Sequence, residues 1–433
     1  MITAADDNGP GRFARDEWRC AAGKLVVLLV EILPSPGRAN LPAHHHHRAR
    51  SSPLGCRIYE RSVIIALRIW LSSAGAASAQ VMQLLRQNPD GVDVTVYASN
   101  VDPGAPALSV CDVPALEPRH VGNAEYAAFA LDFCRTNEID VLIPPRRLDA
   151  LAGRAEDFAA IGTGLMCSPP AAIRTLTSKV RTYRAAAAAG LPVPPWRVVS
   201  DAAGFRAAVD ELSRTEDSLC VKPCGEYSAF GFRILDDRPP SLSSLLGAPR
   251  PVASTEAVAR ALERAAEQGD RIPELLVMPY LEGPEISVDC LSTPAGELLA
   301  GIPRSKNGRF RTLLDDAVSL DIARRLVGHF GVAYLSNVQL RHLRGEPVLL
   351  EANPRPAAGV FQTAFAGVNL PWAAVRLLRH GDAGLERPPR LNICLAVAEA
   401  VMEVAPRPTI PNLHPAAPAS PVPDRASHTM LEA

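Results

Sequence analysis

A carboxylate, an amide and a guanidinium occupy alternate positions in Val348–Gly359, VLLEANPRPAAG. Glu351 and Asn353 close an apolar run that is typical of a buried strand, and Arg355 follows. Because strand side chains alternate between faces, Glu351 and Asn353 point to one side. Such oxygen donors suit Mg²⁺, which takes one or two protein carboxylates and completes its shell with water and substrate phosphates. The spacing indicates a metal and phosphate site, with an ordinary surface ion pair of Glu351 as the alternative.

The preceding strand-like run supplies a further oxygen donor. Residues 337–353 read as two strands joined by a short turn containing Gly345. A hairpin symmetric about Gly345 places Gln339 opposite Glu351, so that Gln339, Glu351 and Asn353 converge on one patch. A one-residue bulge is expected to spoil this register.

The overall composition argues for small-molecule chemistry. The chain has 45 Lys and Arg against 46 Asp and Glu, without a dense basic stripe, which excludes an electrostatic footprint for nucleic acid or an anionic membrane. The nine cysteines are scattered, and Cys220 and Cys224 lack C-x-x-C spacing, so a reduced protein is expected. No apolar run reaches the roughly 18 residues of a membrane span. Acidic residues precede the apolar run KLVVLLVEIL, which disfavours a secretory signal, and a cytoplasmic location is predicted.

Both ends of the chain read as poor in core-forming residues. Residues 1–62 are predicted to be a disordered extension, in which the tract His44–His47 is solvated rather than a metal site. Residues 404–433 are predicted to be a disordered tail rich in Pro and Ala. The folded part therefore lies between these segments.

Residues 63–168 are predicted to form a Rossmann-like domain with a parallel α/β sheet. Buried strand-like runs alternate there with stretches of helical periodicity. The strand-like runs are 63–71, 92–98, 139–145 and 164–168, and the helical stretches are 76–87, 123–137 and 147–160. Gly75 stands alone where a dinucleotide fingerprint needs three glycines, so nicotinamide binding is not predicted.

Residues 169–403 change character. Two short helical segments come first, the second capped by Ser178 and ended by Gly190. Strand-like runs then dominate, with helical stretches near 254–268 and 315–330, which predicts a mixed, largely antiparallel α+β domain. The strand-like runs are SLCVKP, ELLVMPY, EISVDCL, ELLAGIP, NVQLRH and PVLLEAN.

The order of these parts across residues 170–375 resembles the ATP-grasp superfamily, especially its carbamoyl-phosphate-synthetase-like and biotin-carboxylase-like branch. In that branch an α/β domain precedes an ATP-grasp domain of two α+β subdomains, here with a mobile central subdomain near 195–282. One family lysine follows the domain linker and another ends a strand in a V-K-P context. Lys179 and Lys222 match those positions.

The stretch LLVMPYLEGPEISVDC resembles the family's hinge strand and its G-P-E motif. The resemblance implies that Glu285 lies near the ribose or the substrate. It implies that adenine meets the backbone around Val277, Met278, Tyr280 and Leu281. Two departures are visible: Pro279 removes a backbone donor, and the loop CGEYSAFGFRILDD has fewer glycines than the family's phosphate loop often has.

The resemblance also assigns the opening segment. Gln339, Glu351 and Asn353 fall on the family's metal-ligand positions. Arg355 falls on an arginine that faces the reacting phosphate and the substrate. Arg304, in GIPRSKNGRFR, is a candidate for binding an anionic substrate group, because a guanidinium suits bidentate recognition of carboxylate or phosphate.

By this resemblance the protein is expected to be an ADP-forming carboxylate–amine ligase using ATP and Mg²⁺, with Mn²⁺ as an alternative metal. It would activate a carboxylate as an acyl phosphate, which an amine or similar nucleophile then captures. The alternatives are a bicarbonate-using carboxylase or carbamoyl-phosphate-type enzyme, and a catalytically inactive ATP-binding regulatory module. Expected partners are small-molecule substrates, without nucleic acid or membrane, and a homodimer is compatible with the resemblance.

Overall fold

The computed structural model describes residues 66–75, 77–225, 230–239, 241–242, 246–247 and 249–398. All of the described residues belong to the unit that spans residues 63–433. The predictions made for residues 1–62, including His44–His47, and for the tail 404–433 lie outside the described residues. None of the described helices is long and apolar enough to cross a membrane.

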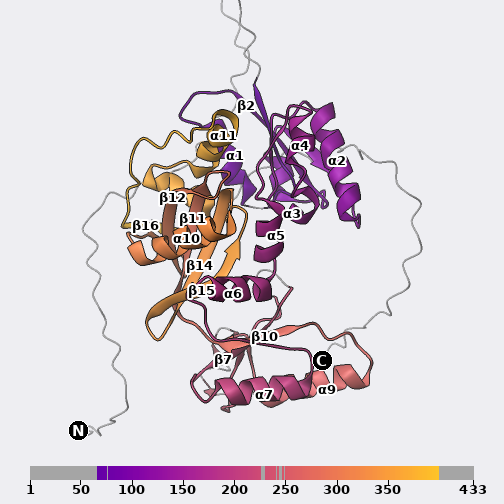
Figure 1. The fold of residues 1–433 in the computed structure, drawn as a ribbon, viewed down its shortest axis with the longest axis vertical. Coiled ribbons are helices and arrows are strands. Elements are labelled where there is room, and N and C mark those ends of the chain that lie inside the picture. Colours follow the sequence, from indigo (N-terminus) through magenta and orange to yellow (C-terminus); the bar gives the residue numbers. More distant parts are fainter. Residues whose placement is uncertain are drawn as a thin grey trace, which may run out of the picture. The chain divides into compact units, whose positions relative to one another are not determined.

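The first sheet is parallel throughout and has the strand order β3-β2-β1-β4-β5. It belongs to the indigo and purple part of the ribbon, where β2, α1 and α2 are labelled (Figure 1). Its strands are β1 (Leu67–Leu71), β2 (Val94–Asn100), β3 (Val113–Leu116), β4 (Val141–Ile143) and β5 (Gly164–Leu165). The accompanying helices are η1 (Pro106–Ser109), α1 (Ser78–Arg86), α2 (Asn123–Thr136), α3 (Leu148–Leu151) and α4 (Ala155–Ala159). The parallel α/β sheet predicted from the sequence is confirmed.

One local prediction for this sheet was wrong, and one strand was missed. The single helix expected over 147–160 is divided into α3 and α4 at Gly153, whose φ of +82° breaks the helix. Strand β3 was not predicted, since it has only four residues and contains Pro114, which is unfavourable in a strand.

Two helices lead out of the first sheet. They are α5 (Pro170–Leu176) and α6 (Lys179–Ala188). The Ser178 hydroxyl caps α6 by accepting the Arg181 N–H at 3.4 Å, and Gly190 follows with a φ of +67°. Both signals predicted for this helix are confirmed, and they set the position of Lys179 in its first turn.

The second sheet has the order β6-β10-β7-β8-β9. Its strands are β6 (Arg197–Val199), β7 (Leu219–Pro223), β8 (Arg233–Leu235), β9 (Val252–Ala253) and β10 (Leu275–Pro279). Helices α7 (Ala202–Leu212) and α9 (Thr255–Glu267) pack on it through a core that includes Phe205, Leu262 and Val277.

The third sheet has the order β15-β14-β11-β12-β13-β16 and is antiparallel. Its strands are β11 (Glu282–Ser292), β12 (Leu298–Asn307), β13 (Phe310–Leu313), β14 (Tyr334–Leu343), β15 (Glu346–Asn353) and β16 (Ile393–Ala396). Its helical segments are α10 (Ala317–Phe330), η2 (Val360–Ala366) and α11 (Leu370–His380). The mixed, largely antiparallel α+β region predicted from the sequence is confirmed.

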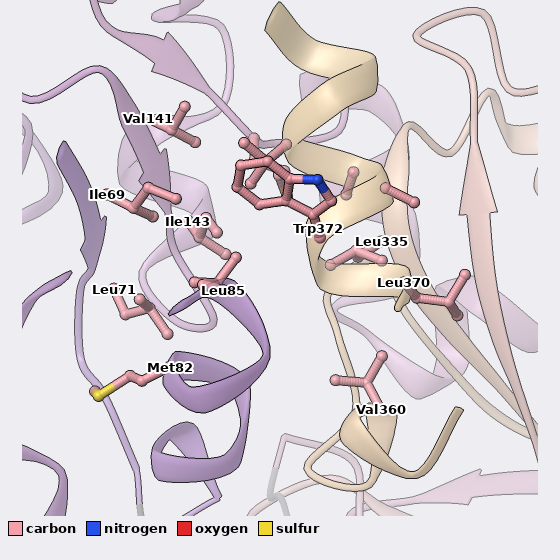
Figure 2. Packing of buried hydrophobic residues seen from close by; sticks show 14 of the residues in the cluster. Ile69, Leu71, Met82, Leu85, Val141, Ile143, Leu335, Val360, Leu370 and Trp372 are labelled. Atoms are coloured by element: carbon pink, nitrogen blue, oxygen red, sulfur yellow. The ribbon is translucent and has the colours of Figure 1, made fainter. Parts of the chain in front are cut away.

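A shared core joins the first sheet to the third. Leu85 of α1 and Ile143 of β4 belong to the same buried cluster as Leu370 and Trp372 of α11 (Figure 2). Polar contacts reinforce it, because Asp90 accepts the Trp372 indole N–H at 2.7 Å and pairs with Arg376 at 2.9 Å. Because Leu335 of β14 belongs to the same cluster, the first sheet packs against both α11 and β14.

Candidate active site

A cleft of about 640 Å³ brings together most of the residues singled out from the sequence. They come from α6, β7, β11, β14, β15 and the segment after β15. The predicted residues lining it are Lys179, Lys222, Glu285, Gln339, Glu351, Asn353 and Arg355. Residues distant in sequence thus share one cavity.

The β14–β15 hairpin places Gln339 opposite Glu351 and Asn337 opposite Asn353. The first of these pairings was predicted, but the reason given for it was wrong. The turn is Arg344–Gly345, with φ values of +54° and +86°, and the hairpin is not symmetric about Gly345. A register shift next to Gln339, where Leu350 is the extra residue, restores the pairing. The bulge creates the site register that it was expected to spoil.

A buried tyrosine of α6 contacts the bulge. The Tyr183 hydroxyl of α6 donates a hydrogen bond to the Leu350 carbonyl at 2.9 Å. Burial raises the pKa of Tyr183, so its hydroxyl remains a donor. Helix α6 therefore supplies both Lys179 to the cleft and the contact that supports the strand irregularity beside Glu351.

The three proposed metal ligands, Gln339, Glu351 and Asn353, all line the cleft. Within the described part of the chain, the side chains of Gln339, Glu351 and Asn353 form no hydrogen bond or ion pair with other residues. The surface ion pair considered for Glu351 is therefore not formed there. Among the described residues, no group of three or more His, Cys, Asp or Glu side chains could hold a metal ion. One carboxylate with two amides fits Mg²⁺, whose remaining positions water and phosphates fill.

Lys222 lies at the end of β7, half-buried, with its ammonium 6.0 Å from the centre of the Tyr183 ring. Burial lowers the pKa of Lys222, and the charge of Lys179 adds to this effect, whereas Cys220 and Glu351 oppose it. A buried ammonium short of anionic partners is stabilised when a phosphate enters. The direction of this shift indicates that burial, rather than an ion pair with a described residue, dominates the surroundings of Lys222.

We expect Lys222→Ala to weaken binding of MgADP by about 10- to 150-fold, because one charge-assisted contact is lost, worth about 1.5–3 kcal/mol. Isothermal titration calorimetry measures the change. Lys222→Arg, which keeps a positive charge at this position, should retain more of the affinity. Equal affinities for Lys222→Ala and the wild type would exclude the phosphate contact.

The strand predicted to meet adenine is an inner strand of the second sheet. Val277 and Met278 are buried in β10 and pair with Val221 and Cys220 of β7. Pairing with β6 ends at Val277, so Met278 lies beyond it.

The two residues after β10 already use part of their backbone. Tyr280 donates its N–H to Ser218 at 2.8 Å, and the Leu281 carbonyl accepts from Arg341 at 3.0 Å. The side chains of Val277, Met278, Tyr280 and Leu281 are not among those lining the cleft. The adenine contact at this strand stays a prediction.

Arg304 is placed differently from the other candidates. It is only 5% exposed, pairs with the fully buried Asp289 at 3.1 Å, and is not among the residues lining the cleft. Asn337, which does line the cleft, donates to the same carboxylate at 3.0 Å. A Cβ on Gly359 would lie 2.7 Å from an Arg304 guanidinium nitrogen. Arg304 therefore packs against the segment that carries Arg355, which favours a positioning role.

The loop after β7 is described only in part, since residues 226–229 lie outside the described residues. Phe230 and Phe232 line the cleft, and Phe230 is 70% exposed. Gly231 has a φ of +70°, and a Cβ there would meet Pro223 at 2.7 Å. This glycine allows the loop to approach the end of β7 beside Lys222.

Sequence reasoning did not assign Asn337, Lys306 or Arg341 to the site, although each lines the cleft. The alternation of strand faces offered a signal for Asn337, which stands two residues before Gln339. Lys306 reaches the cleft because it pairs with Glu285 across β11 and β12. That pairing depends on a strand register which no local pattern fixes.

Comparison with known proteins agrees with this architecture. Residues 69–166 match the family model described as the PylC-like N-terminal domain, and residues 271–401 match the one described as ATP-grasp in the biosynthetic pathway with Ter operon. No curated protein matches the sequence.

Several solved structures share the fold. The biotin carboxylase domain dimer of 2-oxoglutarate carboxylase from Hydrogenobacter thermophilus, in complex with MgADP, ADP and bicarbonate, gives a TM-score of 0.54 at 16% identity, over 76% of this chain and 74% of its own. Campylobacter jejuni biotin carboxylase in its β,γ-ATP complex gives a TM-score of 0.54 at 14% identity, over 76% of this chain and 75% of its own. The ADP complex of N5-carboxyaminoimidazole ribonucleotide synthetase gives a TM-score of 0.52 at 15% identity, over 72% of this chain and 77% of its own. The parallel N-terminal sheet and the two sheets that follow it give this chain the fold of these structures, and residues 271–401 match an ATP-grasp family model, which confirms the resemblance to the ATP-grasp superfamily predicted from the sequence.

Proposed function

We propose that the protein is an ADP-forming ligase that uses ATP and Mg²⁺ to join a carboxylate to an amine or a similar nucleophile. The observation that carries the proposal is that Gln339, Glu351 and Asn353, whose side chains have no hydrogen-bond or ion-pair partner among the described residues, line the same cleft as Lys179 and Lys222. Oxygen donors for a divalent cation beside ammonium groups are what a nucleotide triphosphate requires. The Mg²⁺ and nucleotide bound in the structurally similar Hydrogenobacter thermophilus enzyme support it.

The two folded parts of the chain would divide the work. We propose that residues 169–403 hold the nucleotide, with a mobile central subdomain near 195–282 that carries Lys222. Residues 63–168 would line the side of the cleft where the substrate that accepts the phosphoryl group enters. The substrates would be small molecules, and neither nucleic acid nor a membrane would take part.

The reaction would proceed in two displacements. A carboxylate oxygen of the substrate attacks the γ-phosphorus of ATP, the bond to the β–γ bridging oxygen breaks, and ADP leaves. The nitrogen of the amine then attacks the acyl phosphate carbon, loses a proton, and phosphate leaves. When bound, Mg²⁺ supplies charge neutralisation between the phosphates.

The side chains of the cleft would act by charge and position. Lys179 and Lys222 would bind non-bridging phosphate oxygens as point charges, and Glu285 would border the ribose or the substrate. Arg355 would orient the transferred phosphate against the carboxylate. Arg304, paired with Asp289, would hold the segment of Arg355 in place.

We expect the protein, incubated with ATP, Mg²⁺, hydroxylamine and a panel of carboxylates, to form ADP together with a hydroxamate, because hydroxylamine captures an acyl phosphate. Coupled ADP detection and mass spectrometry of the products provide the measurement. Omission of the carboxylate is the control for uncoupled hydrolysis.

Two other activities predict different results in the same assay. A bicarbonate-using enzyme, suggested by the bicarbonate in the Hydrogenobacter thermophilus complex, would form ADP with bicarbonate alone. A regulatory module would bind ATP tightly and form no ADP across the panel. Either result would contradict the ligase proposal.

A further inference from the structure

A second cavity, of about 380 Å³, adjoins the nucleotide cleft. The two share Lys179, Glu351, Asn353 and Arg355, so the second cavity, here called the acceptor cavity, opens beside the proposed site of phosphoryl transfer. Its volume lies in the range of small-molecule pockets. Its far wall comes from the first sheet, through the segment Pro145–Asp149 that follows β4.

The charges lining the acceptor cavity favour an anion. Its cationic side chains are Arg146, Arg147, Lys179 and Arg355, and its carboxylates are Asp149 and Glu351. Because Glu351 belongs to the proposed metal site, only Asp149 remains to offset the two arginines of the far wall.

Arg147 is built into that wall in a fixed orientation. One guanidinium nitrogen donates to the carbonyls of Val121 and Gly122 at 2.8 and 3.3 Å, and the guanidinium lies 4.7 Å from the centre of the Tyr126 ring. Its Nε is buried and has no hydrogen-bond partner among the described residues. Its backbone has a φ of +59°, an uncommon conformation for a residue other than glycine.

Arg146, the neighbour of Arg147, adds a second positive charge to the wall of the acceptor cavity. It is exposed, lines the acceptor cavity, and forms no hydrogen bond or ion pair with any described residue. The wall therefore combines one arginine held in place by backbone carbonyls with one whose donors are all available. Such a pair is suited to a carboxylate or a phosphate.

The topology of the first sheet points to the same location. In the order β3-β2-β1-β4-β5 the connections change direction between β1 and β4, and ligands of open α/β sheets bind outside the carboxyl ends at such a point. The β1 side is already filled, because the Glu117 carboxylate accepts the Ser73 N–H and the hydroxyls of Ser73 and Ser99, the latter two at 2.7 and 2.6 Å. The β4 side of this point carries Arg146 and Arg147, whereas the β1 side carries the Glu117 carboxylate.

We propose that the acceptor cavity binds a substrate that carries an anionic group, carboxylate or phosphate, in addition to its reacting group, and that Arg147 and Arg146 recognise that anion. The inference rests on the proposed function. The reacting end of the substrate would lie toward Arg355 and the proposed metal ligands, and the anionic end toward the loop after β4. The packing of Leu85 and Ile143 against Trp372 would hold the two ends at a constant separation (Figure 2).

The test uses glutarate and inorganic phosphate as probes, with neutral glutaramide for comparison. Calorimetric titrations are run on the protein saturated with Mg²⁺ and a non-hydrolysable ATP analogue, which occupies the nucleotide phosphate positions, and on the protein without nucleotide. Arg146→Leu and Arg147→Leu should each raise the dissociation constant of the bound probe by about tenfold, since one charge-assisted contact is lost. Arg135→Leu, which removes an exposed arginine of α2 outside both cavities, is the matched control.

If glutarate binds and phosphate does not, the anionic group of the substrate is a carboxylate. If phosphate binds and glutarate does not, that group is a phosphate. Binding of both probes would show that the two arginines recognise either anion. Failure of both probes to bind the wild type, or unchanged binding in Arg146→Leu and Arg147→Leu, would overturn this inference. If Arg147→Leu does not fold, the titrations of Arg147→Lys and Arg146→Leu still test the inference, because Arg146 is exposed. If the wild type did not bind the ATP analogue, the proposed function would be overturned. The probe titrations without nucleotide would still test the role of the two arginines.

Discussion

Glu351→Gln is expected to lower Mg²⁺-dependent ADP formation by about 10²- to 10³-fold, the usual loss when a preorganised electrostatic group is removed from a reacting site. Glutamine has nearly the shape of glutamate, so the packing of β15 stays intact and only the negative charge is lost. Since Glu351 has no ion-pair partner among the described residues, the substitution breaks no ion pair there. Turnover should therefore fall while the thermal unfolding midpoint hardly changes.

The measurement is a steady-state assay of ADP at a series of Mg²⁺ concentrations, with unfolding followed in parallel. Asn353→Ala should show a similar loss, because it removes an amide oxygen from the same strand face. Glu346→Gln is the matched control, since it makes the same chemical change at an exposed position of β15 next to the turn. Unchanged turnover in both Glu351→Gln and Asn353→Ala would show that these residues bind no catalytic metal.

The β14–β15 hairpin shows how far the sequence could predict the site. The alternation of Glu351 and Asn353 was readable, because the period of a strand is a local property. The bulge at Leu350 was not, because it depends on the Arg344–Gly345 turn and on the hydrogen bond from Tyr183 in a distant helix. The correct pairing of Gln339 with Glu351 was thus reached from an incorrect geometry.

Arg304 and Arg147 show what sequence reasoning could not decide. In sequence both are arginines in basic surroundings, and nothing local separates a buried one from one that lines a cavity. Arg304 is buried because its strand neighbour β11 presents Asp289 to it. Arg147 faces a cavity because the loop after β4 meets α6 and the end of β15, three segments far apart in the chain. Tertiary contacts of this kind were missed, whereas the parallel sheet and the long strands were predicted from periodicity.

Breaking the buried pair of Arg304 and Asp289 should cost more stability than any surface change in the protein. Among the described residues, Arg304→Met leaves the fully buried Asp289 carboxylate with the Asn337 amide as its one side-chain partner, and removal of one member of a buried pair costs about 3–5 kcal/mol. Chemical denaturation monitored by fluorescence measures the loss. Arg206→Met, which breaks exposed ion pairs to Glu256 and Glu263, is the matched control and should change stability far less.

The pH dependence of that loss identifies its cause. Burial raises the pKa of Asp289, and Arg304 and Asn337 oppose the rise, so the pKa should rise further in Arg304→Met. Above the unfolded-state pKa the folded variant then binds more protons than the unfolded chain, and stability falls as the pH increases. The deficit of Arg304→Met should accordingly be smaller in mild acid than at neutral pH, and Asp289→Asn combined with Arg304→Met should remove this dependence. A deficit that is the same at both pH values would mean that lost packing, rather than an unpaired carboxylate, destabilises the variant.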